Sequence, residues 1–145
     1  MSADGIIELK RIFEQCPLRY FSVKELLTMG GSHYAKKAKN STIPERYARN
    51  LYAIGCQANE IRTRLGRPLI IVSGYRSESY NDYVGGAYRS YHLKGRALDL
   101  KPVNSKYLPE LKLIGRDLHE EGLVGGLGFY STFMHVDTGP KRRWG

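Results

Sequence analysis

Apolar residues recur at alternating spacings of four and three through the middle of the chain, which places them along one stripe of an α-helix. The stripe consists of Tyr47, Leu51, Ile54, Ala58, Ile61 and Leu65. Thr42 is the expected N-cap, with Glu45 as the capping-box acid and Pro44 in the first turn. Gly66 and Pro68 end the pattern. We therefore predict a helix that packs against the core.

Short apolar and β-branched runs after this helix predict strands. Residues 69–72 form a continuous apolar run, which is typical of a buried strand. Residues 97–100 and 133–137 alternate between the two faces of a strand. A second helix is expected over 109–122, with Pro109 in its first turn and Gly122 at its end.

Weaker helical patterns occur over 6–13 and 23–27. The order of elements predicts a small α+β domain with a mostly antiparallel sheet flanked by helices. A chain of 145 residues is the size of one domain, so we expect a single domain over residues 1–145. Cys16 and Cys56 are too few and too far apart for a disulfide framework, and we expect free, buried thiols.

Charge changes the picture of possible partners. Twenty-three Lys and Arg residues against fourteen Asp and Glu residues give a net charge of +9, which favours anionic partners. No groove-reading motif accompanies this charge, so nucleic acid is not expected. No apolar run approaches the ~20 residues of a membrane span, so membrane insertion is not expected either. Residues 1–5 lack the features of a secretory signal, which predicts a cytoplasmic protein. We also expect a monomer.

The candidate chemistry lies in His92, Asp99 and His135. Gly95 allows the chain to turn so that His92 reaches the strand face that carries Asp99. Three such ligands with an open fourth position suit hydrolytic zinc, and the same set also suits iron in a two-histidine, one-carboxylate oxygenase. A histidine satisfied in the core, and an Asp99 paired with Arg96, remain open alternatives at this point.

Several motifs together resemble the zinc D-alanyl-D-alanine carboxypeptidase family. That family includes murein endopeptidases, and it is related to lysostaphin-type enzymes and hedgehog signalling domains. The similarity covers residues 21–144 and is greatest to short single-domain enzymes of bacteria, phages and prophages. The motifs are Ser73-Gly74-Tyr75-Arg76-Ser77, Asn81, Val84-Gly85-Gly86-Ala87, Ser90-x-His92-x-x-Gly95-x-Ala97-x-Asp99, Gly125-Gly126-x-Gly128-x-Tyr130, Phe133-x-His135-Val136-Asp137 and Arg143-Trp144.

The resemblance implies site residues position by position. It makes His92, Asp99 and His135 the zinc ligands, the set named above. It places Arg76 facing the substrate, where a guanidinium polarises a carbonyl or holds a carboxylate, although a salt bridge is the alternative. Ser90 either binds substrate or orients the loop. The motif region is rich in tyrosine, and we expect Tyr130 to contact the substrate.

The expected proton acceptor departs from the family pattern. Many members have Glu or Asp three residues before the last histidine, where this chain has Thr132. Asp137 is the available substitute, either as the general base or as the partner that fixes the imidazole of His135. His119 is expected to be a solvated residue of the second helix. The glycine-rich pieces lack phosphate-loop spacing, and we interpret them as tight turns beside the site.

The resemblance therefore implies a zinc-dependent peptidase, a carboxypeptidase or endopeptidase, that hydrolyses a stem-peptide or cross-link amide bond of peptidoglycan. The basic surface would attract such an enzyme to an anionic cell wall. The expected location is the cytoplasm until release to the wall, as for a phage lysis enzyme or virion component. The alternative is a non-catalytic peptidoglycan-binding or phage tail module that retains the fold.

Overall fold

In the computed structural model the described residues are 4–28, 43–83, 85 and 90–145. The elements in chain order are α1 (Asp4–Gln15), α2 (Val23–Leu26), α4 (Glu45–Leu65), β1 (Leu69–Ser73), α5 (Glu78–Tyr83), the 3-10 helix η1 (Tyr91–Lys94), β2 (Ala97–Pro102), the 3-10 helix η2 (Ser105–Tyr107), α6 (Leu108–Glu120), β3 (Gly126–Phe129), β4 (Met134–Asp137) and β5 (Arg142–Trp144). No helix in these ranges has the length and hydrophobicity needed to cross a bilayer.

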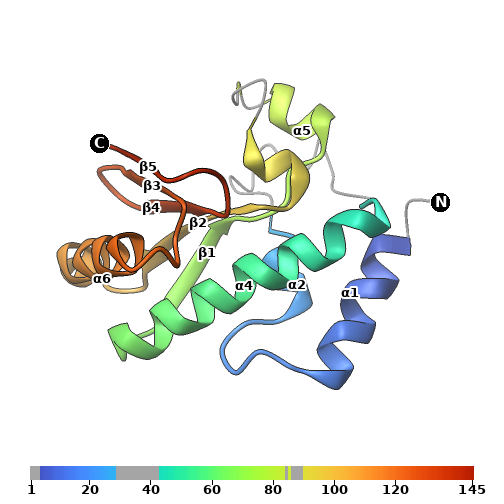
Figure 1. Ribbon diagram of the computed structural model, residues 1–145, viewed down its shortest axis with the longest axis horizontal. Helices are drawn as coiled ribbons and strands as arrows, with labels where there is room; N and C mark the ends of the chain where they lie inside the picture. The colour runs from blue at the N-terminus through green and yellow to red at the C-terminus, as the bar shows by residue number, and fades with distance from the viewer. Residues whose placement is uncertain (1–3, 29–42, 84, 86–89) are drawn as a thin grey trace.

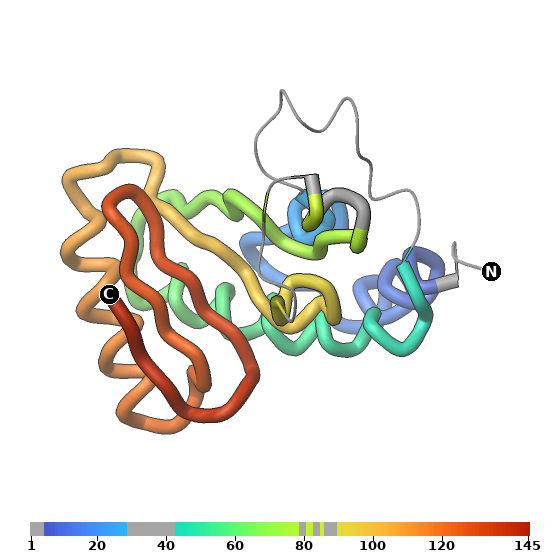
Figure 2. Tube along the Cα trace, turned by 90° about the horizontal axis from the view of Figure 1, so that it is seen from above, coloured from blue at the N-terminus to red at the C-terminus, as the bar shows by residue number. Residues whose placement is uncertain are grey.

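The strands form one sheet in the order β1-β2-β4-β3-β5. Three neighbouring pairs are antiparallel, and β5 runs parallel to β3. Helices α4 and α6 lie along one face of this sheet, while on the other face no helix of the described residues covers β4 and β3 (Figures 1 and 2). The predicted α+β fold with a mostly antiparallel sheet is therefore confirmed.

The hydrophobic core lies between the sheet and the helices. Strand residues Leu98, Leu100, Leu127 and Val136 are fully buried there. Helix α4 contributes most of the stripe that its periodicity predicts, with Ala48 buried and Tyr47 only partly buried. Because side chains alternate along a strand, residues between these apolar positions point to the opposite face.

The start of α4 differs from the prediction. Its N-cap position is Pro44, and no side chain caps the helix there. Thr42, the predicted cap, lies outside the described residues, as does most of the glycine segment 84–87. At the other end Gly66 adopts a left-handed φ of 65°, which is the expected glycine ending of a helix.

Residues 125–128 were expected to form a tight turn, and this prediction is wrong. Gly126–Phe129 is strand β3, which lies between β4 and β5. Glycine is uncommon in strands because it packs no side chain, so the pattern favours a turn. In this sheet the missing side chains make room for groups from both neighbouring strands.

The cysteine prediction is correct in one part only. Both Cys16 and Cys56 are free, and both are exposed rather than buried. Cys16 follows the end of α1, and Cys56 lies within α4. Cysteine is among the most frequently buried residues, and that general tendency does not hold on these helix surfaces.

Candidate metal centre and cavity

His92 is placed by a short turn of 3-10 helix. Ser90 is the N-cap of η1, and its Oγ accepts a hydrogen bond of 3.2 Å from the backbone N–H of His92. Gly95 ends the turn with a left-handed φ of 67°, a conformation that favours glycine. Ser90 thus orients this loop, which was one of its two expected functions. The turn holds His92 against the start of β2.

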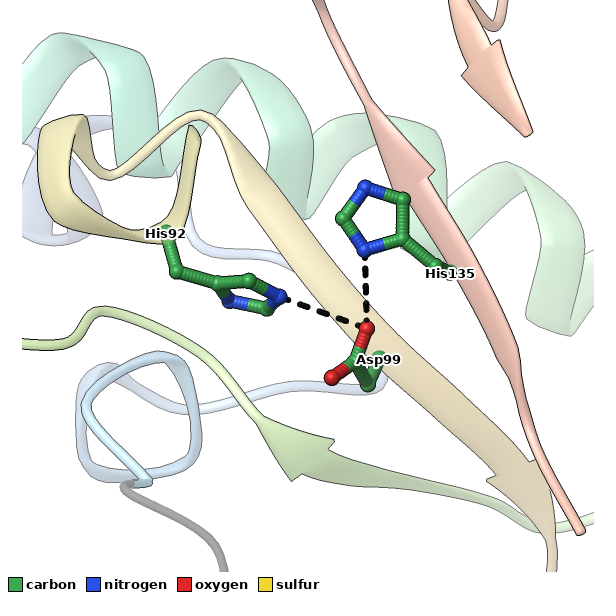
Figure 3. Close-up of side chains that lie close together, drawn as sticks. All are labelled: His92, Asp99 and His135. Carbon is green, nitrogen blue, oxygen red and sulfur yellow. Dashed lines mark hydrogen bonds and ion pairs between the residues drawn. The ribbon is translucent and has the colours of Figure 1, made fainter. Parts of the chain in front are cut away.

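Asp99 and His135 are placed by strand register. They are directly paired across β2 and β4, and Ser73 pairs with Asp99 from β1. The imidazole of His92 enters from η1 on the same side (Figure 3). One ligand atom from each of His92, Asp99 and His135 lies within 4.8 Å of the others. The structure therefore brings together the three residues that the sequence singled out.

Hydrogen bonds fix which nitrogen of each imidazole faces Asp99. His92 Nδ1 lies 2.7 Å from the carbonyl oxygen of Gly74, which can only accept, so Nδ1 carries the hydrogen and Nε2 faces Asp99 at 3.3 Å. His135 Nε2 lies 2.8 Å from Asp137 Oδ2, and its Nδ1 lies 2.9 Å from Asp99 Oδ1. His92 Nε2 and His135 Nδ1 therefore face the same oxygen, Asp99 Oδ1.

This arrangement fits a cation. A neutral imidazole has one N–H, and His135 lies between two carboxylates that only accept hydrogen bonds. With the hydrogen on Nε2, the lone pair of Nδ1 faces an oxygen of Asp99, and the lone pair of His92 Nε2 faces the same oxygen. Two nitrogens and one carboxylate oxygen that converge in this way are a zinc-type ligand set, and also suit ferrous iron.

The charges in the centre shift its pKa values strongly. Burial alone raises the pKa of Asp99, but the neighbouring imidazoles of His135 and His92 outweigh it and hold that pKa well below its usual range. For His135 burial lowers the pKa, but the adjacent carboxylates of Asp137 and Asp99 outweigh it and raise the pKa overall. Asp99 is therefore an ionised carboxylate, ready to bind a cation.

Arg76 lies beside the other oxygen of Asp99. Its Nη2 is 3.5 Å from Asp99 Oδ2, its Nε donates to Ser73 Oγ at 3.2 Å, and its Nη1 donates to Asn81 Oδ1 at 3.3 Å. The side chain is only 18% exposed. The ion pair with Asp99 was the alternative reading of this arginine, and it is present. Arg76 also lines the cavity above the centre.

Asp137 does not line that cavity. It is fully buried, and its two oxygens accept hydrogen bonds from His135 Nε2, from the N–H groups of Gly126 and Gly139, and from both terminal nitrogens of Arg142. Burial raises its pKa, but the bonds from His135, Arg142 and Gly139 hold that pKa well below its usual range. This environment matches a partner of His135, and it leaves no direct path from Asp137 to the cavity.

A cavity of about 330 Å³ opens over His92, Asp99 and His135. Aromatic side chains form one of its walls: Tyr130 and Phe133 stack at 4.5 Å, and Trp144 Nε1 donates to Tyr130 Oη at 2.9 Å. Tyr130, an expected substrate contact, is 41% exposed at the mouth. The remaining lining residues include Ser90, Tyr91 and Arg142.

His119 was expected to be solvated, and this is wrong. It is 6% exposed, and its Nδ1 lies 3.1 Å from the carbonyl oxygen of Val124. His119 packs at the end of α6 against the following loop. Its position on the helix therefore does not predict that it is buried. His119 is not among the residues that line the cavity.

Sequence reasoning missed the part played by Arg142 and Trp144 on β5. Both line the cavity, and Trp144 packs 5.3 Å from the ring of His135. A usable signal exists: Gly126 and Gly128 share one face of β3, and Arg142 and Trp144 repeat the same spacing of two. Register pairs Gly126 with Arg142 and Gly128 with Trp144; the ring of Trp144 lies over Gly128, and the carboxylate of Asp137 lies over Gly126.

Comparison with known proteins places this geometry in context. The family described as Peptidase M15 matches residues 20–137. The peptidoglycan L,D-endopeptidase MepK of Escherichia coli strain K12 is 35% identical over 85 residues, which cover 54% of this chain and 44% of that protein. A probable peptidoglycan L,D-endopeptidase MepK of Haemophilus influenzae is 38% identical over 94 residues, covering 58% of this chain and 48% of that protein. The chain thus aligns with less than half the length of these relatives.

Proposed function

Because the chain belongs to the Peptidase M15 family, we propose that it is a zinc-dependent peptidase that hydrolyses an amide bond in the peptide part of peptidoglycan. The observation that carries the proposal is the convergence of His92, Asp99 and His135 within 4.8 Å at the base of a cavity. The names of the relatives add peptidoglycan as the substrate. Membership of a peptidase family favours zinc over the iron alternative.

His92, Asp99 and His135 would hold the metal through Nε2, a carboxylate oxygen and Nδ1. Zinc bound by three such ligands supplies Lewis acidity, which polarises a carbonyl and makes water nucleophilic at neutral pH. The protein contributes rigidity, because two of these residues lie on adjacent strands and the third lies on a capped turn. The ligands are therefore held in place before the metal binds.

Arg76 and the aromatic wall would bind the substrate. A guanidinium has five N–H groups, and the contacts of Arg76 with Ser73, Asn81 and Asp99 use three of its nitrogens once each. The remaining N–H groups would hold a carbonyl or carboxylate of the peptide. Tyr130 and Trp144 offer flat, partly exposed rings at the cavity mouth, which suit a peptide or sugar ring.

Asp137 would act as the partner of His135 rather than as the general base. Its oxygens are occupied by five hydrogen bonds, and it is shielded from the cavity. A hydrogen-bonded carboxylate behind a metal-binding imidazole fixes the tautomer and makes the ring a better ligand. This assigns to Asp137 the second of the two functions expected from the sequence.

Digestion of purified peptidoglycan by the zinc-loaded protein, followed by mass spectrometry of the products, tests the proposal. We expect new soluble fragments whose masses identify the bond that is cut. His92→Ala should lose both zinc and cleavage, while Thr132→Ala, at an exposed position outside the cavity lining, should keep both. Cleavage that survives in a folded His92→Ala variant would overturn the proposal.

One observation favours a second candidate, a non-catalytic module that binds peptidoglycan. Among the residues that line the described cavity, Asp99 is the only carboxylate, and Thr132 stands where many relatives of this kind carry an acid. Such a module would sediment with cell wall and hold zinc. The absence of cleavage at every pH tested, with zinc bound stoichiometrically, would support this candidate over the enzyme.

A further inference from the structure

The guanidinium of Arg142 holds both oxygens of Asp137. Its Nη1 lies 3.0 Å from Oδ1 and its Nη2 lies 2.8 Å from Oδ2, a two-point contact that fixes the plane of the carboxylate. Arg142 comes from β5 and Asp137 from β4, and both are paired with Gly126 of the intervening strand β3. A Cβ atom on Gly126 would collide with the carboxylate of Asp137. The glycine therefore creates the space in which the two charges meet.

Arg142 is itself held on several sides. Its guanidinium lies 4.8 Å from the ring of Tyr91 and 5.3 Å from the ring of Trp144, within the range of cation–π contacts. Its Nη1 also donates to the carbonyl oxygen of Pro140 at 2.9 Å. A side chain restrained in this way can fix its partner, which a mobile arginine on the surface cannot do.

The hydrogen bonds on Asp137 divide its oxygens between two tasks. Oδ1 accepts from the backbone N–H groups of Gly126 and Gly139, at 3.0 and 2.8 Å, and from Arg142. Oδ2 faces His135 Nε2 and is supported by the second nitrogen of Arg142. A rotation of the carboxylate would break bonds on both oxygens, so its orientation toward His135 is fixed.

From this geometry we propose that Arg142 is a positioning residue, which acts through Asp137 to keep His135 in the orientation and tautomer that present Nδ1 toward Asp99. The inference rests on the proposed zinc site, and it extends that site to the last strand of the chain. Without the guanidinium, the fully buried carboxylate of Asp137 would lose the arginine with which it forms an ion pair, and of the hydrogen bonds given for the described residues those from His135 and two backbone N–H groups would remain. Changes to partners of metal ligands typically cost about 10–100-fold in metal affinity or activity.

Arg142→Ala, Arg142→Lys and the control Arg143→Ala test the proposal. Arg143 is the next residue on β5, and it is exposed. Zinc affinity is measured by competition with a chromogenic chelator, thermal unfolding reports folding, and nitrogen NMR of the His135 ring reports its tautomer. We expect a 10–100-fold loss of zinc affinity and a mixed tautomer population in Arg142→Ala, a smaller loss in Arg142→Lys, and wild-type values in Arg143→Ala.

Gly126→Ala is a second test of the proposal, and it removes no polar group from the site. Its methyl group displaces the carboxylate of Asp137, so zinc affinity should fall in a folded protein whose Arg142 is intact. If Arg142→Ala does not fold, Arg142→Lys and Gly126→Ala decide the matter. Wild-type zinc affinity and an unchanged His135 tautomer in the folded variants would overturn the proposal. A wild-type protein that binds no zinc would instead refute the proposed function.

Discussion

The two faces of the sheet are formed by the same strands, but one face carries apolar side chains and the other carries ionisable ones. On the helix side, Leu98 and Val136 are fully buried among apolar neighbours. On the other side, Asp99 and Asp137 are buried and His135 is mostly buried, but every one of them is ionisable. The first face stabilises the fold by removing apolar surface from water, whereas the second pays a desolvation cost to assemble a ligand set.

This difference teaches how the site is tolerated. The buried carboxylates lie beside opposite charges, Asp99 beside Arg76 and Asp137 beside Arg142. Each ion pair offsets, within the site itself, part of the cost of burying its carboxylate. The residues that compensate these charges therefore lie on the polar face and not on the apolar one. Substitutions on the two faces should therefore separate metal binding from folding stability.

The largest expected effect is on zinc binding. Asp99→Ala removes the oxygen toward which both imidazoles point, so zinc affinity should fall by more than about 100-fold, beyond the usual cost of losing a partner of a ligand. Equilibrium dialysis followed by metal analysis measures this loss. Thr132→Ala serves as the control. Retention of tight, stoichiometric zinc by a folded Asp99→Ala protein would contradict the ligand assignment.

Next in size is the loss of folding stability from the helix side. Leu98→Ala removes a fully buried side chain and should lower the free energy of unfolding by about 2–5 kcal/mol. Ile70→Ala, at a position 38% exposed on β1, should cost less. Urea unfolding measures both variants. Zinc affinity of folded Leu98→Ala should stay near wild type, and a loss as large as that of Asp99→Ala would show that the faces are coupled.

Substrate binding should respond at the cavity wall. Trp144→Ala removes an aromatic ring that lines the cavity and bonds to Tyr130, so KM for soluble muropeptides should rise about tenfold, the scale of an interfacial aromatic contact. Steady-state kinetics and zinc affinity are measured on the same sample. A fall in zinc affinity with KM unchanged would assign Trp144 to the support of His135 instead.

The smallest effect concerns the surface charge. With a net charge of +9, the protein should bind peptidoglycan less tightly as salt rises from about 0.05 to 0.5 M, since screening shortens the reach of exposed charges. Sedimentation with purified cell wall measures the bound fraction. Binding that is independent of salt would show that the cavity, and not the basic surface, holds the protein to the wall.

The helical layer and part of the candidate metal site could be predicted from sequence because their signals are local. The apolar stripe of α4 and the spacing from His92 through Gly95 to Asp99 each sit within a few turns of chain. The pairing of Asp99 with His135, by contrast, depends on strand register across 36 intervening positions. Residue type suggested the set and the resemblance to a known family supported it, but neither specifies this strand register.

The remaining features of the site depend on pairing between short strands, and each of these strands has only a weak sequence signal of its own. β3 begins with glycine, which favours the prediction of a turn, and its partner β5 is three residues long. Arg142 can bind Asp137 only when β5 lies beside β3, because the Asp137 carboxylate is then within reach across Gly126. The exposure of Asp137 and His119 likewise follows from tertiary packing, which residue type and periodicity do not specify.

X-ray absorption spectroscopy of the zinc-loaded protein tests the metal centre most directly. We predict one zinc ion per chain with two imidazole nitrogens at about 2.0–2.1 Å and a carboxylate oxygen at about 2.0–2.2 Å. In the His135→Ala variant the spectrum should lose one imidazole. Sulfur in the coordination sphere, or an imidazole count that His135→Ala does not change, would contradict a centre formed by His92, Asp99 and His135.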